Sequence, residues 1–197
     1  MNEILVLYYS KSGSVKELAS FIARGINSVD GAEAKIRTVP EIFPEVKNQK
    51  NSIPETGSLY ANLDDLSNCS ALALGSPTRF GNMAAPLKYF IDTATPLWLK
   101  GSLENKPACV FTSTGSLHGG NESTLLSMHI PLFHMGMIVL GLPYSIPELS
   151  KTNSGGTPYG ASHVSNQEKV LSISEEEKKL CIAQGIRLAE ITLKLNK

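Results

Sequence analysis

The stretch "EILVLYYSKSGSVKELASFI", residues 3–22, decides the fold of this chain. It opens with an apolar run of strand length, residues 3–9, and such runs are typical of strands covered on both faces of a parallel sheet. After a serine-rich turn, apolar residues recur at helical spacing, namely Val15, Leu18, Ala19 and Ile22. The stretch therefore predicts a strand, a tight turn and an amphipathic helix. Ser14 with Glu17 predicts a capping box at the start of that helix.

The same alternation continues along the chain. Further strands are predicted at residues 34–39, 70–76, 108–113 and 137–143. Helices are predicted at 59–66, 83–94, 123–135 and after Ser174, which forms a second capping box with Glu177. Strands alternating with helices predict an α/β fold, an open parallel sheet with helices on both faces, in a single domain over residues 1–197. Residues 40–57 are predicted to be mostly loop, and residues 144–172 a long loop insertion.

Composition limits the possible partners. Lys+Arg and Asp+Glu both number 18, so the formal net charge is zero, and no basic surface predicts a nucleic-acid partner. No apolar run approaches the ~20 residues that cross a bilayer, and no signal peptide is recognisable, so we expect no stable membrane insertion. The three cysteines lie far apart without a CxxC pair. This spacing argues against a metal site or a disulfide framework and fits a reducing, cytoplasmic location.

The first loop with a chemical signal is "SKSGSV", residues 10–15. Ligands of open α/β sheets bind beyond the carboxyl ends of the strands, and this loop leaves such an end. Its three serine hydroxyls, its glycine and the start of a helix can direct hydrogen-bond donors at one anion. The loop has neither the Walker pattern nor GxGxxG, so a monophosphate fits better than a nucleotide triphosphate or a dinucleotide. An ordinary strand-to-helix turn is the alternative.

Two further loops leave the same edge of the predicted sheet, "SPTRFGN" at 76–82 and "STGSLHGGNE" at 113–122. In the first, Arg79 could pair with a carbonyl or phosphate of a ligand, and Phe80 offers an apolar face. The glycines of the second expose backbone N–H groups. A surface turn and a flexible connector with a helix cap at Asn121 are the alternatives. A flat heteroaromatic ring on these two loops, with its phosphate in the first loop, satisfies all three compositions, which describes flavin mononucleotide (FMN).

Six motifs support a resemblance to a known family: "VLYYSKSGS" at 6–14, "GSPTRFGNM" at 75–83, "LW" at 97–98, "STG" at 113–115, "HMGM" at 134–137 and "GGTPYGA" at 155–161. The sequence resembles, over nearly its whole length, the flavodoxin-like NAD(P)H:quinone oxidoreductases of the WrbA family. The resemblance implies a flavodoxin-like sheet of five parallel strands, in the order 2-1-3-4-5 when they are numbered as predicted above. It also implies a homotetramer whose active sites are built near subunit contacts.

The resemblance also implies site residues. The FMN phosphate would be bound by Ser10, Lys11, Ser12, Gly13, Ser14 and Val15. The ring would be lined by Pro77, Thr78, Arg79, Phe80, Gly81 and Asn82. Its other edge and the ribityl chain would be held by Ser113, Thr114, Gly115, Ser116 and Gly119, and His134 would approach the flavin from a neighbouring part of the pocket. The substrates would contact Trp98, Phe80 and Ser12, where Ser12 replaces an aromatic residue usual in the family. Alternatively, Trp98 fills a gap at the end of its helix and His134 is a hydrogen-bonded structural histidine.

The implied activity is the two-electron reduction of quinones to quinols by NAD(P)H. It would run by a ping-pong mechanism in which hydride passes through the flavin N5 atom. No catalytic side chain and no metal is implied, because the cofactor performs the chemistry. Two other functions remain open at this point: a one-electron carrier like flavodoxin, and an FMN-binding scaffold or regulatory protein without significant turnover.

Overall fold

The computed structural model describes residues 1–42, 54, 57–166 and 172–196. Its parallel sheet consists of β1 (Asn2–Tyr8), β2 (Ala32–Thr38), β3 (Ala71–Arg79), β5 (Pro107–Thr114), β6 (Ile138–Val139) and β7 (Ala161–Val164). The strands follow the order β2-β1-β3-β5-β6, and β7 also pairs with β5. Because β5 and β6 are the fourth and fifth predicted strands, the predicted flavodoxin-like order is confirmed.

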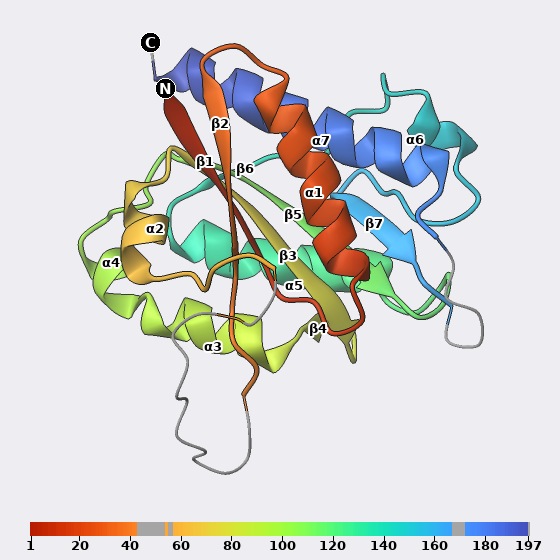
Figure 1. Ribbon diagram of the computed structural model, residues 1–197, viewed down its shortest axis with the longest axis horizontal. Coiled ribbons are helices and arrows are strands. Elements are labelled where there is room, and N and C mark those ends of the chain that lie inside the picture. Colours follow the sequence, from red (N-terminus) through yellow and green to blue (C-terminus); the bar gives the residue numbers. More distant parts are fainter. Residues whose placement is uncertain (43–53, 55–56, 167–171, 197) are drawn as a thin grey trace.

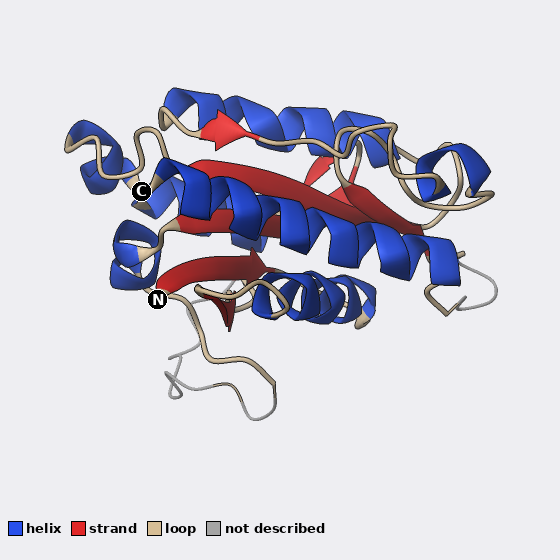
Figure 2. Ribbon diagram, turned by 90° about the horizontal axis from the view of Figure 1, so that it is seen from above, coloured by secondary structure: helices blue, strands red, loops and turns tan. Residues whose placement is uncertain are grey.

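Helices cover both faces of the sheet (Figure 2). They are α1 (Ser14–Asn27), α2 (Leu63–Asn68), α3 (Ala85–Thr93), α4 (Thr95–Leu99), α5 (Asn121–His134), α6 (Glu148–Lys151) and α7 (Glu175–Leu195). Along β1, Ile4 and Val6 are buried against α1 and α7, whereas Leu5 and Leu7 are buried against α3 and α5. Burial of alternate residues on opposite faces explains the unbroken apolar run that predicted this strand.

The two helices on one face, α1 and α7, cross with their backbones close together. A Cβ atom added to Gly25 of α1 would collide with the carbonyl oxygen of Ile182, and one added to Gly185 of α7 would collide with that of Ile22. Glycine is required at both positions because the neighbouring backbone occupies the place of a side chain. Figure 1 shows these two helices beside one another, with the start of α1 at the end of the sheet.

The fifth strand position differs from the prediction. Only Ile138–Val139 of the predicted strand 137–143 forms a strand, β6, which pairs with the start of β5. The end of β5 pairs instead with β7, which lies inside the predicted insertion 144–172. The two pieces are joined by an excursion closed at its base by a hydrogen bond of 2.9 Å from the Leu142 amide to the Pro158 carbonyl. The insertion therefore divides one strand position instead of lying outside the sheet.

Several local predictions also need correction. The predicted loop 76–82 is largely a hairpin, because β3 continues to Arg79 and pairs antiparallel with β4 (Asn82–Met83). The capping box of Ser14 and Glu17 is wrong, since Gly13 with φ of 100° takes the cap position without a side-chain hydrogen bond. Asn121 is likewise the first residue of α5, not its cap, and Gly120 precedes it.

Other predictions are confirmed. Ser174 and Glu177 form the expected capping box at α7. The predicted loop 40–57 lies mostly outside the described residues. Among the described helices, none is both long and apolar enough to cross a membrane.

Candidate functional site

The first loop, between β1 and α1, presents a group of unpaired donors. The Gly13 amide donates to Ser10 Oγ at 3.1 Å, and this bond shapes the turn. Within the described part of the chain, the amides of Ser14, Val15 and Lys16 have no hydrogen-bond partner, nor do the hydroxyls of Ser12 and Ser14. N–H groups in the first turn of a helix point out of its N-terminus, where the helix dipole is positive. The loop can therefore hold an anion such as a phosphate.

Individual side chains of this loop differ in what they can contribute. No atom lies within 4 Å of the position that a Cβ on Gly13 would take, so the space beside this residue is open. Val15 is buried in the core under α1, so only its amide faces a ligand. Ser12 is exposed and Ser14 half-buried.

The second loop is the tip of the β3–β4 hairpin. Phe80 and Gly81 have φ of 51° and 76°, the left-handed values that a two-residue type I′ turn requires. Phe80 is fully exposed, at 108% of its reference surface. A phenylalanine that is both strained and exposed gains nothing for folding and is typical of a ligand contact. Arg79 donates to its neighbour's carbonyl, Thr78 O, at 2.7 Å and is otherwise exposed.

The third loop joins β5 to α5 and is tied together internally. The hydroxyl of Thr114 lies 2.9 Å from the Ser116 carbonyl and 3.2 Å from Asn121 Oδ1. Asn121 in turn donates from Nδ2 to the Leu117 carbonyl, and the Gly119 amide donates to Ser116 O at 3.0 Å. Ser113 and Thr114 are buried in β5, whereas residues 116–119 are exposed. The sequence predicts only a capping role for Asn121, but its side chain bonds to Thr114 and Leu117 within the loop.

The second and third loops lie against one another. Thr124 Oγ1 donates to Thr78 Oγ1 at 2.7 Å, and Ser127 Oγ donates to Asn82 Oδ1 at 3.2 Å. A Cβ on Gly120 would lie 3.3 Å from Gly81 Cα, so only glycine permits this approach without a shift. Figure 1 shows the start of α1, the β3–β4 hairpin and the start of α5 at the same end of the sheet. The three predicted loops therefore converge.

Trp98 and His134 lie elsewhere. They share a cavity of about 350 Å³ with residues of α3, α4 and α5, and none of its lining residues belongs to the three loops. His134 ends α5, whose 14 residues span about 20 Å from the third loop. Both side chains are exposed, and His134 makes no hydrogen bond within the described residues. The structure thus does not bring these two residues to the loops of their own chain, and it does not support a hydrogen-bonded structural role for His134.

A second cavity, of about 420 Å³, borders the first two loops and contains residues that the sequence did not indicate. Lys11 and Arg79 line it together with Tyr9, Glu41, Ile42 and Ala84–Pro86. Glu41 Oε1 accepts from Lys11 Nζ at 2.6 Å and from the Tyr9 hydroxyl at 3.1 Å. The Lys11 ammonium and then the Tyr9 hydroxyl hold the pKa of the Glu41 carboxyl below its usual range. Nothing local in the sequence could pair residues 30 positions apart.

Comparisons with known proteins agree with this geometry. A family model described as NADPH-dependent FMN reductase matches residues 3–148. The chain belongs to this family. A relative from Acidithiobacillus ferrooxidans named NAD(P)H dehydrogenase (quinone) is 43% identical over 99% of both chains. Another with that name, from Chromohalobacter salexigens, is 42% identical over 99% of both. The resemblance stated from the sequence motifs is therefore confirmed.

Solved structures of a WrbA-like protein and of a flavodoxin have the same fold as this chain. A flavodoxin-like, WrbA-like protein from Agrobacterium tumefaciens superposes with a TM-score of 0.70, at 18% identity, over 98% of this chain and 99% of that one. A flavodoxin from the domain Archaea gives a TM-score of 0.64, at 20% identity, over 97% and 99%. At these identities, the likeness concerns the fold alone.

The residues present fit FMN, the cofactor of the FMN reductase family. The unpaired amides at the start of α1 suit a phosphate, and the exposed ring of Phe80 suits a flat partner. Within the described residues, no group of three or more His, Cys, Asp or Glu side chains could hold a metal ion.

Proposed function

We propose that the protein is an NAD(P)H:quinone oxidoreductase that binds FMN at residues 10–15, 77–82 and 113–119. The observation that carries this proposal is the convergence of three loops, one with unpaired helix amides and one with a strained, exposed phenylalanine. Its relatives' names and its family support the same activity.

The chain's own residues bind and orient the participants. The amides of Ser14–Lys16 and the hydroxyls of Ser12 and Ser14 donate hydrogen bonds to the phosphate. The Thr78–Thr124 hydrogen bond fixes the hairpin that carries Phe80 against α5, so the exposed ring keeps its place beside the third loop. When bound, FMN supplies the chemistry: it accepts a hydride from NAD(P)H and delivers two electrons to a quinone. The ping-pong order of the two substrates is part of the proposal.

We also propose that the active molecule is a cytoplasmic homotetramer. His134 lies about 20 Å from the third loop of its own chain, and the cavity it shares with Trp98 contains no residue of the three loops, so a substrate role for the two requires a second copy. Large apolar side chains are exposed around their cavity, including Leu99, Ile130 and Phe133, and such a surface suits contact between copies. Three unpaired cysteines fit a reducing compartment.

The test is spectroscopic. Purified protein mixed with FMN should retain a yellow chromophore through gel filtration, and NADH or NADPH added without oxygen should bleach it at near-equal stoichiometry. Addition of benzoquinone should restore the colour and sustain steady-state oxidation of the reductant. A protein that stays colourless overturns the proposal. A yellow protein that NAD(P)H does not bleach is a carrier or a scaffold, not this enzyme.

A further inference from the structure

A buried histidine–carboxylate pair lies outside the three loops. His163 of β7 and Glu177 of α7 are each 1% exposed, and His163 Nδ1 lies 2.8 Å from Glu177 Oε2. Burying charged groups is costly unless they are paired and hydrogen-bonded. A chain that retains such a pair far from solvent therefore raises the question of what the pair holds in place.

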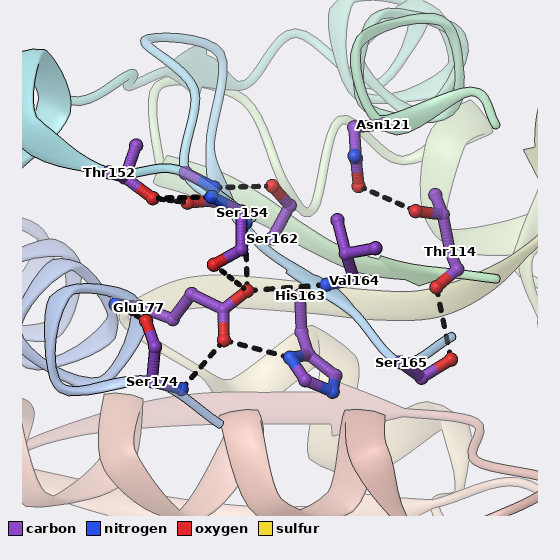
Figure 3. A network of polar contacts seen from close by, with 12 residues as sticks. Thr114, Asn121, Thr152, Ser154, Ser162, His163, Val164, Ser165, Ser174 and Glu177 are labelled. Atoms are coloured by element: carbon purple, nitrogen blue, oxygen red, sulfur yellow. Dashed lines mark hydrogen bonds and ion pairs between the residues drawn. The ribbon is translucent and has the colours of Figure 1, made fainter. Parts of the chain in front are cut away.

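The Glu177 carboxylate joins three segments (Figure 3). Its Oε1 atom accepts from Ser154 Oγ at 3.0 Å, from the Gly155 amide at 2.8 Å and from the Val164 amide at 3.2 Å. Its Oε2 atom accepts from the Ser174 amide at 2.9 Å as well as from His163. Burial raises the pKa of Glu177, but the hydrogen bonds from His163 and from backbone amides outweigh it and leave the pKa lowered. The carboxylate is thus charged, and both of its oxygens accept hydrogen bonds.

Through these bonds Glu177 anchors β7, a strand of four residues whose described strand partner is β5 alone. Two residues of this strand contact Glu177. The Val164 amide donates to its carboxylate, and the carboxylate orients the His163 ring. A strand so short, at the edge of a sheet, has little stability of its own. Its position therefore depends on the carboxylate of α7.

The anchored strand leads directly to the third loop. Just beyond β7, the amide and the hydroxyl of Ser165 both donate to the Thr114 carbonyl, at 2.8 and 3.0 Å. Thr114 is the residue whose hydroxyl contacts Ser116 O and Asn121 Oδ1. Figure 3 shows these polar contacts extending from Glu177, along β7, to the root of the loop.

We propose that Glu177 and His163 are positioning residues for the flavin: acting through β7 and Ser165, they hold Thr114 and with it the loop of residues 115–119. This inference rests on the proposed function only in placing FMN on that loop. The pair touches no reacting atom, so its effect is on how tightly the loop holds the cofactor. The sequence predicts only a helix-capping role for Glu177 and no role for His163.

The test compares FMN dissociation constants, measured by titrating full-length apoprotein and following the quenching of flavin fluorescence. His163→Val removes the donor to Glu177 and leaves a buried carboxylate oxygen short of a partner, so the dissociation constant should rise about tenfold. His163→Asn keeps an N–H donor near the position of Nδ1 and should restore most of the affinity. The visible circular dichroism of the bound flavin should change in His163→Val and not in His163→Asn.

Leu188→Ala is the matched control. Leu188 is 1% exposed and lies on the same helix, about 16 Å along its axis from Glu177, so its truncation lowers stability without touching β7. We expect a lower melting temperature and an unchanged dissociation constant. If His163→Val does not fold, Ser165→Ala takes its place, because that half-buried hydroxyl donates directly to Thr114; it should weaken FMN binding about threefold.

The outcomes separate the two proposals. Wild-type protein that binds no FMN overturns the proposed function. If the wild type binds FMN and His163→Val binds it equally well, only the positioning role is overturned. The same holds for Ser165→Ala where it takes the place of His163→Val. Equal weakening by His163→Val and Leu188→Ala also overturns it, since the effect would then follow stability alone.

Discussion

Replacing Gly13 with alanine is the most direct test of the proposal that the first loop, residues 10–15, binds the FMN phosphate. Gly13 has φ of 100°, which L residues rarely adopt, and no atom lies within 4 Å of the new Cβ. The cost is therefore backbone strain without a clash, about 1–2 kcal/mol. With open space around it, the turn relaxes this strain, and the relaxation turns the amides of Ser14–Lys16 away from the point at which they converge. We expect the dissociation constant for FMN to rise about 5- to 30-fold.

The assay compares FMN with riboflavin, which lacks the phosphate. Gly13→Ala should weaken FMN binding and leave riboflavin binding nearly unchanged, so the FMN-to-riboflavin ratio of dissociation constants should rise. Fluorescence titration of the apoprotein measures both. This ratio isolates the phosphate contact from any general loosening of the flavin site.

Gly31→Ala provides the control. Gly31 has φ of 90° and precedes β2, at the opposite end of α1 from the loop. Both variants should lose about 1–2 kcal/mol of unfolding free energy, but only Gly13→Ala should lose preference for the phosphate. An FMN-to-riboflavin ratio that stays within twofold of wild type in Gly13→Ala would refute the assignment of the phosphate to this loop.

Three further predictions follow from the structure. Phe80→Gly relieves the strain of φ 51°, about 1 kcal/mol, so the melting temperature should rise while kcat/KM for benzoquinone falls, in a comparison of thermal melts and steady-state rates. The lowered pKa of Glu177 adds stability above its unfolded value of 4.5 that is lost as pH falls through the folded value. Glu177→Gln should therefore be less stable at neutral pH and lose less stability on acidification, as urea unfolding at several pH values would show. Burial raises the pKa of Cys69 to about 11 and that of Cys109 to about 12, so a thiol reagent at pH 8 should label neither until denaturant is added, by mass spectrometry.

The sheet could be predicted because its signals are local. Residues 3–9 and 108–113 are apolar runs buried on both faces, and each is followed by a helix with its own periodicity. The strand β7 could not be found in this way, since "ASHV" is short and half polar. Its strand conformation depends on β5 and on Glu177, which lie far from it in sequence.

In the candidate site, too, local features could be predicted from the sequence and long-range contacts could not. Loop composition was enough to single out the turn of residues 10–15 and the turn of Phe80, because turn residues act through their own backbones. The cap at Ser14 was wrong for a related reason: glycine next to it takes the cap position at positive φ. The pairing of Lys11 with Glu41 could not be predicted from the sequence, because only the folded chain brings the two residues together. The separation of Trp98 from the three loops likewise became visible only in the structure.

The fifth position of the sheet is shared by two short strands, β6 and β7, and the segment that joins them can accept inserted residues. The segment between β6 and β7 leaves and returns at a closed base, where the Leu142 amide donates to Pro158, and Tyr144 just beyond is 67% exposed. A peptide tag or small reporter placed beside Tyr144 would lengthen the excursion without changing any ladder partner. Each doubling of such a segment costs only about 0.6 kcal/mol of closure entropy. This position is therefore suited to carrying an epitope or a fluorophore that leaves the cofactor site intact.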